Sequence, residues 1–297
     1  MSKELHSHIE KNKDVLIYVN GELLHKNDAK ISVFDSGFMM GDGVWEGIRL
    51  VNNRWLFIDE HLERLFEGAK AIDLEIGLTI EDIKIALENT RSVNNMTDNA
   101  HARLMVTRGI KSKPFQRPSY SMNGPTVVII MEHSDDSINN NPISLATVPQ
   151  VRGTPMMQDP KLNSHSKLNC ILACIQAEKA GADEALMLDP LGFVNTTNSC
   201  NFFIVKKGKV WTSTGDYCMN GITRKKVISI CKDNEIPIFT KNFSLVDVYS
   251  ADESFVTGTL GSITPVSEID GRKIEDKSNH KITEKLQSLY LQLIKNG

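Results

Sequence analysis

The polar tract from Ser134 to Pro142 is the feature that most constrains how this chain folds. It contains turn-forming residues throughout and almost no apolar side chain to bury. Strand-like and helix-like patterns lie on both sides of it. We therefore interpret 134–142 as a surface linker between a smaller domain at 1–133 and a larger one at 143–297. A long loop inside a single domain is the competing interpretation.

The first half mixes short strands with amphipathic helices. Apolar runs at Val15–Val19, Arg103–Arg108 and Thr126–Met131 predict strands, while Asp59 and Thr79 are expected to cap helices. The order lacks a strict strand–helix–strand rhythm. This pattern predicts an α/β chain of the α+β kind, with largely antiparallel or mixed sheets.

The second half repeats this mixture. Strands are predicted at Ala185–Leu188 and Phe202–Val205, and helices begin near Thr223 and Leu245. A further helix carries a stripe of apolar side chains at helical spacing, formed by Leu168, Ile171, Leu172 and Ile175.

Composition excludes several classes of protein. The 297 residues include 34 basic and 37 acidic side chains, a net charge of −3, which argues against nucleic-acid binding by bulk positive charge. No apolar run approaches the ~20 residues that cross a bilayer, and the polar N-terminus lacks the apolar core of a secretory signal. An odd count of 5 cysteines is typical of reduced thiols. These features predict a soluble cytoplasmic enzyme or ligand binder that contacts neither membrane nor nucleic acid.

Three glycine-containing segments could bind an anion. Asn220–Arg224 places a glycine before a predicted helix, where free N–H groups suit a phosphate. The two glycines of Thr257–Ser262 allow the backbone to approach a ligand closely. Gly41–Gly43 precedes Arg49, whose guanidinium could bind a phosphate or carboxylate through two hydrogen bonds. Each segment alone is typical of an ordinary turn, but the three together favour a phosphorylated ligand.

Metal binding is not predicted. Cys170 and Cys174 lie one helical turn apart on an apolar helix, so we interpret them as small core residues, and His165 alone does not complete a zinc site. Glu46 and Glu178 are interpreted as solvated or structural carboxylates rather than as a catalytic acid and base.

Lys167 stands at the start of the apolar helix. An ammonium in a first helical turn opposes the helix dipole and releases its proton more readily, as a Schiff-base lysine must. From spacing alone, an ordinary surface lysine is the favoured interpretation.

Nine motifs stand in a characteristic order along the chain: Val19–Gly21, Phe38, Gly41–Arg49, His61–Leu65, Ala185–Asp189, Asn201–Phe203, Gly221–Arg224, Thr257–Thr259 and Thr264–Val266. This order resembles the fold-type IV pyridoxal-phosphate enzymes, the class IV aminotransferases, which include branched-chain and D-amino-acid aminotransferases. The resemblance covers nearly the whole chain. It implies two α/β domains with pyridoxal 5′-phosphate between them, a homodimer, and an amino acid and a 2-keto acid as substrates.

The resemblance also implies roles for individual residues. Arg49, the backbone of Ile222, Thr223 and Thr259 would bind the cofactor phosphate, with Asn201 in the same cofactor-binding set. On the substrate side, Phe38, Met39 and Met40 would line an apolar pocket, Arg103 would help to hold a carboxylate, and Leu260 and Gly261 would offer backbone N–H groups.

Two positions depart from the family pattern. A gapless comparison places the Schiff-base position at Asn163, so we expect Lys167, one helical turn later, to supply the amine, with Lys161 as the alternative. The family glutamate at the pyridine nitrogen falls on Thr196, whose hydroxyl can donate to a neutral nitrogen but cannot hold a proton there as a carboxylate does. The cofactor ring would then be a weaker electron sink.

The sequence therefore predicts an aminotransferase that moves an amino group between an apolar, possibly branched-chain, amino acid and a 2-keto acid. Lys167 would hold the cofactor and move the proton. A pyridoxal-phosphate lyase of the aminodeoxychorismate-lyase type and a catalytically silent homologue are the alternatives.

Overall fold

The computed structural model describes residues 10–134, 141–274 and 281–296, which form two compact units. Unit 1 comprises Met1–Asp136 with Asn163–Ser166, and unit 2 comprises Ser137–Leu162 with Lys167–Gly297. Most of the predicted linker, residues 135–140, lies outside the described residues, so the predicted domain boundaries stay a prediction. No sequence pattern indicates that 163–166 belongs with the first half of the chain.

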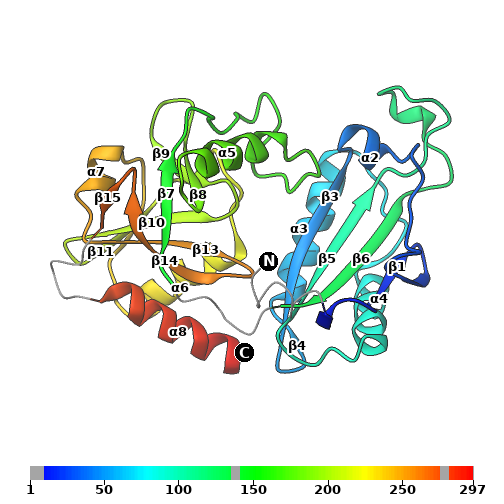
Figure 1. Ribbon diagram of the computed structural model, residues 1–297, viewed down its shortest axis with the longest axis horizontal. Helices are drawn as coiled ribbons and strands as arrows, with labels where there is room; N and C mark the ends of the chain where they lie inside the picture. The colour runs from blue at the N-terminus through cyan, green and yellow to red at the C-terminus, as the bar shows by residue number, and fades with distance from the viewer. Residues whose placement is uncertain (1–9, 135–140, 275–280, 297) are drawn as a thin grey trace. The chain divides into compact units, whose positions relative to one another are not determined.

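Unit 1 is built on one antiparallel sheet of six strands in the order β2-β1-β6-β5-β3-β4 (Figure 1). Helices α3 (Ile58–Ala71) and α4 (Ile80–Val93) pack on one face of this sheet. The strands are β1 (Leu16–Val19), β2 (Glu22–His25), β3 (Gly43–Val51), β4 (Arg54–Trp55), β5 (Ala100–Thr107) and β6 (Thr126–His133). The three strands predicted in this half are confirmed within a few residues.

The starts of α3 and α4 test the predicted caps. The Thr79 hydroxyl accepts a hydrogen bond from Asp82 N, and the Asp82 carboxylate accepts one from Thr79 N, so the predicted cap of α4 is confirmed. The prediction for Asp59 is wrong, because the chain enters α3 through Phe57 in the left-handed region, at φ 54°. Asp59 instead lies in the first turn, where a carboxylate complements the helix dipole.

The short helix α2 (Ser36–Met40) precedes β3. Its N-cap Asp35 accepts a hydrogen bond from Gly37 N at 2.8 Å, and its C-cap Gly41 adopts φ 68°. A side chain at Gly41 would place its Cβ 2.6 Å from Ser166 Oγ, so this position requires glycine for space as well as for conformation.

Unit 2 contains a mixed sheet of nine strands. β9 pairs with both β8 and β10, so that the strands β10-β13-β14-β7-β8-β9 close on themselves, and β7 runs parallel to β8 and β14. The strands are β7 (Ile143–Thr147), β8 (Glu184–Leu188), β9 (Val194–Thr197), β10 (Asn201–Lys206), β11 (Lys209–Thr212), β12 (Ile238–Thr240), β13 (Glu253–Gly258), β14 (Ser262–Ile269) and β15 (Arg272–Lys273). The predicted α+β class with antiparallel and mixed sheets is confirmed.

The helices of unit 2 are α5 (Leu168–Lys179), α6 (Ile222–Asp233), α7 (Leu245–Tyr249) and α8 (Ile282–Asn296). α6 and α8 contact each other and strand β13. Within the described ranges, no helix of either unit has the length and apolar character that crossing a membrane requires.

Helix α5 buries a different face from the one that its apolar residues suggest. Ala173 and Ala177 are its fully buried residues, and they pack with Ala185 and Met187 of β8. Cys170 and Cys174 are only half-buried, so their interpretation as core residues is wrong. The small alanines fill the narrow space over β8. The predicted apolar stripe is exposed to solvent, and it comprises Leu168, Ile171, Leu172 and Ile175.

A buried ion-pair cluster joins β3 to α3. The Glu46 side chain is 1% exposed, and its Oε2 lies 2.7 Å from His61 Nδ1. Arg64 donates from Nε to Oε1 at 2.7 Å and from Nη2 to Oε2 at 2.8 Å. Burial alone would raise the pKa of Glu46, but the hydrogen bonds from His61 and Arg64 outweigh it and hold this pKa below its ordinary value. Glu46 is thus a structural carboxylate.

We expect Glu46→Gln to lower the free energy of unfolding by about 3–5 kcal/mol, because the neutral amide removes the buried negative charge that His61 and Arg64 bind. Since folding lowers the pKa of Glu46, its contribution is present above the unfolded pKa of about 4.3 and is lost as the pH falls through the folded value. Urea unfolding between pH 7 and pH 3 measures both effects.

The control for this prediction is Glu88→Gln, which breaks the more exposed pair with Arg91. It should cost only about 0–1 kcal/mol. Equal losses in the two variants would contradict the assignment of Glu46 as the buried anchor of α3.

Candidate functional site

The N-terminus of α6 in unit 2 is open to an anion. Its N-cap is Gly221, which has no side chain to cap the helix. The first N–H groups of an α-helix have no partner within the helix, and they carry the positive end of its dipole. Ile222 and Thr223, the predicted phosphate contacts, are the first two helical residues, and both are buried.

A second feature lies beside this helix end. Thr257 on β13 is 2% exposed, and its Oγ1 has no hydrogen-bond partner among the described residues. Thr257 pairs directly with Asn201 of β10, and cross-strand partners project their side chains from the same face. The Asn201 side chain reaches the α6 N-cap, since its Oδ1 accepts from Gly221 N at 3.1 Å. The unsatisfied Thr257 hydroxyl therefore lies on the face of the sheet from which Asn201 reaches the N-terminus of α6. We call Gly221–Thr223 together with Thr257 the α6 anion site.

Arg224 adds positive charge next to the α6 anion site. Its guanidinium is buried and donates to Ser213 O at 2.7 Å and to Asn220 Oδ1 at 3.2 Å. Burial lowers the pKa of Arg224. These bonds also hold the loop that leads into α6.

The hairpin turn between β13 and β14 carries the other predicted residues of unit 2. Thr259, Leu260 and Gly261 form this turn directly after β13, and Leu260 and Gly261 are exposed. Thr264 Oγ1 donates to Gly261 O at 3.0 Å, which stabilises the turn. The turn begins two residues after Thr257.

Asn201 and Thr196 use their polar atoms within unit 2. Asn201 donates from Nδ2 to Met219 O at 2.9 Å and accepts from Gly221, so it shapes the loop before α6. Thr196 Oγ1 donates to Cys200 O at 2.6 Å. A hydroxyl has one proton, so Thr196 offers a further partner only its lone pairs, and the expected donation to a pyridine nitrogen is not available in this structure.

Lys167 is the N-cap residue of α5 and is half-buried. The segment that precedes it, Asn163–Ser166, belongs to unit 1, where it pairs with β3. Asn163 O accepts from Trp45 N at 3.0 Å, and His165 N donates to Gly43 O at 3.0 Å. The chain immediately before Lys167 is therefore fixed by backbone hydrogen bonds.

Asn163 cannot replace a Schiff-base lysine. Its side chain is an amide, and Nδ2 donates to Trp45 O at 2.6 Å in a buried position. Lys161, the alternative amine, is exposed to solvent. Of the two lysines considered from the sequence, Lys167 is the more sheltered.

Unit 1 carries the remaining predicted residues. Arg49 is buried on β3, and the Arg103 guanidinium of β5 stacks on the Trp45 ring at 3.9 Å from its centroid. Phe38 on α2 is 70% exposed, and Met40 is half-buried. The structure thus brings Ile222, Thr223 and Asn201 together in unit 2, with Arg49, Arg103 and Phe38 in unit 1.

The donor set of unit 2 fits a phosphate ester. An open helix N-terminus and a buried hydroxyl without a partner among the described residues are hydrogen-bond donors that suit a phosphate dianion. Thr257 lies in a segment that the sequence singles out, but its hydroxyl was not among the predicted phosphate contacts. Strand alternation places it on the same face as Phe255 and opposite Val256 of the apolar core. No cluster of three potential metal ligands occurs in the described parts of the chain.

Comparison with known proteins gives a consistent result. Residues 43–269 match the family model described as amino-transferase class IV. A putative branched-chain-amino-acid aminotransferase of Methanocaldococcus jannaschii is 40% identical, over 92% of this chain and 94% of that protein. A branched-chain-amino-acid aminotransferase-like protein 2 of Arabidopsis thaliana is 38% identical over 96% of this chain, which spans only 51% of the plant protein's length.

The fold comparison agrees. A crystal structure of the branched-chain aminotransferase of Thermoproteus uzoniensis with norvaline has a TM-score of 0.85 at 30% identity, with 95% of each chain covered. This chain therefore has the fold-type IV architecture that the motif order predicts.

We expect Thr257→Val to raise the dissociation constant for pyridoxal 5′-phosphate by about 10- to 100-fold, because a hydrogen bond to a charged phosphate is lost. The ligand-free variant should be as stable as the wild type or more stable, since the substitution removes an unsatisfied buried hydroxyl. Calorimetric titration and urea unfolding measure the two quantities.

Thr212→Val is the matched control. Thr212 is also fully buried in this sheet, but its Oγ1 donates to Phe202 O at 2.9 Å. This variant should lose about 1 kcal/mol of stability and keep its affinity for the phosphate ester. If Thr257→Val also keeps its affinity, Thr257 is not a phosphate contact.

Proposed function

This chain belongs to the class IV aminotransferase family, and from that premise we propose that it is a pyridoxal-phosphate-dependent aminotransferase. Its substrates would be an apolar, branched-chain amino acid and a 2-keto acid. The observation that carries the proposal is the α6 anion site, where an open helix end and the unpartnered Thr257 hydroxyl match a phosphate ester.

Several residues of this chain would bind or orient the cofactor. Ile222 and Thr223 bind the phosphate through first-turn N–H groups, and Thr259 and Arg49 stay the further predicted contacts. When bound, pyridoxal 5′-phosphate supplies an electron sink for chemistry at the amino acid's α-carbon. Asn201 orients the loop that presents the helix end.

Lys167 supplies the amine and the proton-transfer group in this proposal. It is the half-buried lysine next to the fixed segment Asn163–Ser166, and the buried amide at Asn163 cannot take its place. With Thr196 as an acceptor only, no carboxylate holds a proton at the ring nitrogen in this proposal.

Several residues support an apolar substrate. Phe38 and Met40 of α2 present an aromatic and a flexible thioether side chain, and Arg103 is the predicted carboxylate ligand. The archaeal relatives described above are named as branched-chain aminotransferases. All five cysteines are free thiols, which supports a reducing, cytoplasmic setting.

A borohydride-labelling experiment tests the proposed amine. We expect the protein loaded with pyridoxal 5′-phosphate to absorb at about 410–430 nm and, after reduction, to carry the label on Lys167. Lys167→Ala should abolish the absorbance and the label, while the matched variant Lys161→Ala should keep both. Peptide mass spectrometry identifies the labelled residue.

Each result of this experiment has a defined meaning. A label on Lys161 would reverse the assignment, and the absence of any lysine label would remove covalent catalysis from the proposal. A panel of L- and D-amino acids then tests transamination, since the bound cofactor's spectrum shifts when it accepts an amino group. If no amino acid shifts the spectrum of the bound cofactor, the proposed transamination activity is wrong.

We also propose a homodimer that covers the exposed apolar stripe of α5. Contiguous exposed apolar side chains on a helix mark protein–protein contacts. The four residues of the stripe recur at helical spacing and are 40–66% exposed; they are Leu168, Ile171, Leu172 and Ile175. A second copy of the chain is the partner that the family resemblance implies.

We expect Ile171→Asp to raise the dimer dissociation constant by about 100-fold or more, because it places an unpaired charge in an apolar contact. Sedimentation velocity across a concentration series measures this constant. The matched control is Val246→Asp on α7, where one valine is 75% exposed. A dimer that is unaffected by Ile171→Asp, or a monomeric wild type, would contradict this proposal.

A further inference from the structure

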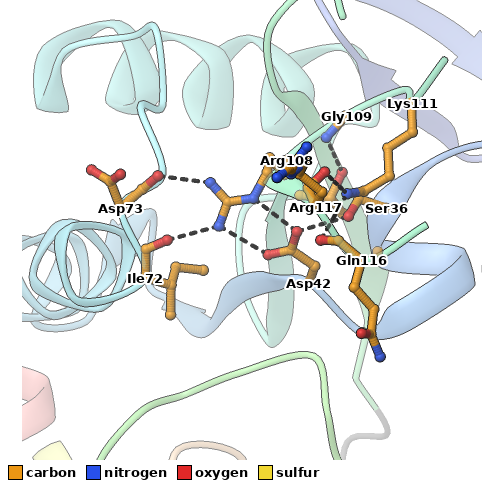
Figure 2. Close-up of polar contacts among 12 residues, drawn as sticks. Ser36, Asp42, Ile72, Asp73, Arg108, Gly109, Lys111, Gln116 and Arg117 are labelled. Atoms are coloured by element: carbon orange, nitrogen blue, oxygen red, sulfur yellow. Dashed lines mark hydrogen bonds and ion pairs between the residues drawn. The ribbon is translucent and has the colours of Figure 1, made fainter. Parts of the chain in front are cut away.

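Arg108, directly after β5, is the centre of a hydrogen-bond network in unit 1 (Figure 2). Its guanidinium binds the Asp42 carboxylate through two bonds, from Nε to Oδ2 at 2.8 Å and from Nη2 to Oδ1 at 3.1 Å. It also donates to two backbone carbonyls at the end of α3, Ile72 O and Asp73 O, each at 2.7 Å. Four hydrogen bonds thus link the end of α3 to the loop after α2.

Hydrogen bonds of Asp42 and of Thr107, the residue before Arg108, hold the two ends of α2. After the helix, Asp42 Oδ2 accepts from Ser36 Oγ at 2.7 Å, and the Arg108 backbone N donates to Asp42 O at 3.3 Å. Before the helix, the N-cap Asp35 accepts from Thr107 Oγ1 at 3.0 Å. A five-residue helix has few bonds of its own, so these side chains hold α2 in place together with the backbone bond from Ser36 N to Gly109 O at 2.9 Å.

The chain that follows α2 also receives the segment before Lys167. Ser166 Oγ donates to Gly41 O at 3.2 Å, and His165 N donates to Gly43 O at 3.0 Å. Asp42, the partner of Arg108, stands between these two glycines. Asp42, which Arg108 binds, therefore lies between α2 and the backbone that pairs with the segment Asn163–Ser166.

We propose that Arg108 is a positioning residue that sets amino-acid specificity by fixing α2, and with it Phe38 and Met40, against the end of α3. This inference rests on the proposed function, because it assigns Phe38 and Met40 to the substrate's side chain. Arg108 itself binds no reacting group in this proposal.

Arginine suits this position better than lysine does. A planar guanidinium binds a carboxylate through two bonds while its remaining N–H groups reach carbonyls, whereas an ammonium acts as a single point of charge. Asp42 is half-buried, and burial alone would raise its pKa. The bonds from Arg108 and Ser36 outweigh burial and hold the pKa of Asp42 below its ordinary value, so the carboxylate stays ionised for Arg108 at neutral pH.

The experiment compares Arg108→Met with Arg108→Lys in the full-length protein. We expect Arg108→Met to lower the ratio of kcat/KM for leucine to that for alanine by about tenfold, because a displaced α2 discriminates side-chain size less well. Arg108→Lys should retain part of the ratio. A loss of folded enzyme would instead lower both kcat/KM values by the same factor and leave the ratio unchanged.

A second measurement does not depend on activity. Hydrogen–deuterium exchange of the cofactor-free protein should show at least about tenfold faster exchange for residues 36–42 in Arg108→Met, with β5 and β6 unchanged. Should Arg108→Met fail to fold, Asp42→Asn tests the same ion pair with a smaller change.

The matched control is Arg91→Met. Arg91 on α4 also binds a carboxylate, that of Glu88, and a backbone carbonyl, that of Met96 after the end of the helix. It should change neither the specificity ratio nor exchange at 36–42. Unchanged exchange at 36–42 in Arg108→Met, or an unchanged leucine-to-alanine ratio, overturns the inference. A wild-type protein without transamination overturns the proposed function instead, and exchange then still decides whether Arg108 holds α2.

Discussion

The open edge of β3 is the constraint on which the candidate site depends. β5 pairs with β3 from Gly43 to Leu50, but on the other edge β4 reaches only Leu50 and Val51. Buried backbone N–H and C=O groups require partners, and Asn163–His165 supplies them at the start of the strand. Because these bonds involve the backbone, the chain before Lys167 is held in place whether or not residue 163 carries an amine.

The alternation of β3 separates structural from functional side chains. Glu46, Ile48 and Leu50 point toward the helices, where Glu46 binds α3. Residues 45, 47 and 49 point the other way, and Trp45 stacks there on Arg103. One strand therefore connects the helical core of unit 1 with the residues that the family resemblance assigns to ligands. Arg108 and Asp42 extend this framework to α2, where the ends of the helix are held by side chains from β5 and from the loop before β3.

The parts of the site that could be predicted from the sequence are those encoded by neighbouring residues. The three glycine-containing segments together indicate anion-binding backbone, and the structure places Gly221 at the N-cap of α6. What could not be predicted is which partner each side chain meets in the folded chain. Thr196 Oγ1 donates a hydrogen bond to Cys200 O, and Asn163 Nδ2 donates one to Trp45 O. Helix α5 buries alanines rather than its larger apolar residues. Asp59 was misassigned because the left-handed Phe57 has no signal in composition.

The two departures from the family pattern change where binding free energy can come from. A lysine at 163 or a carboxylate at 196 would be a buried charge without its partner in the ligand-free protein, at a cost of several kcal/mol. Asn163 and Thr196 avoid that cost, because both bond to backbone carbonyls without any ligand. The unsatisfied Thr257 hydroxyl and the α6 N-terminus, whose N-cap is a glycine, remain at the proposed phosphate site. A ligand therefore gains most by satisfying this end, so the phosphate rather than the ring should dominate affinity in this chain.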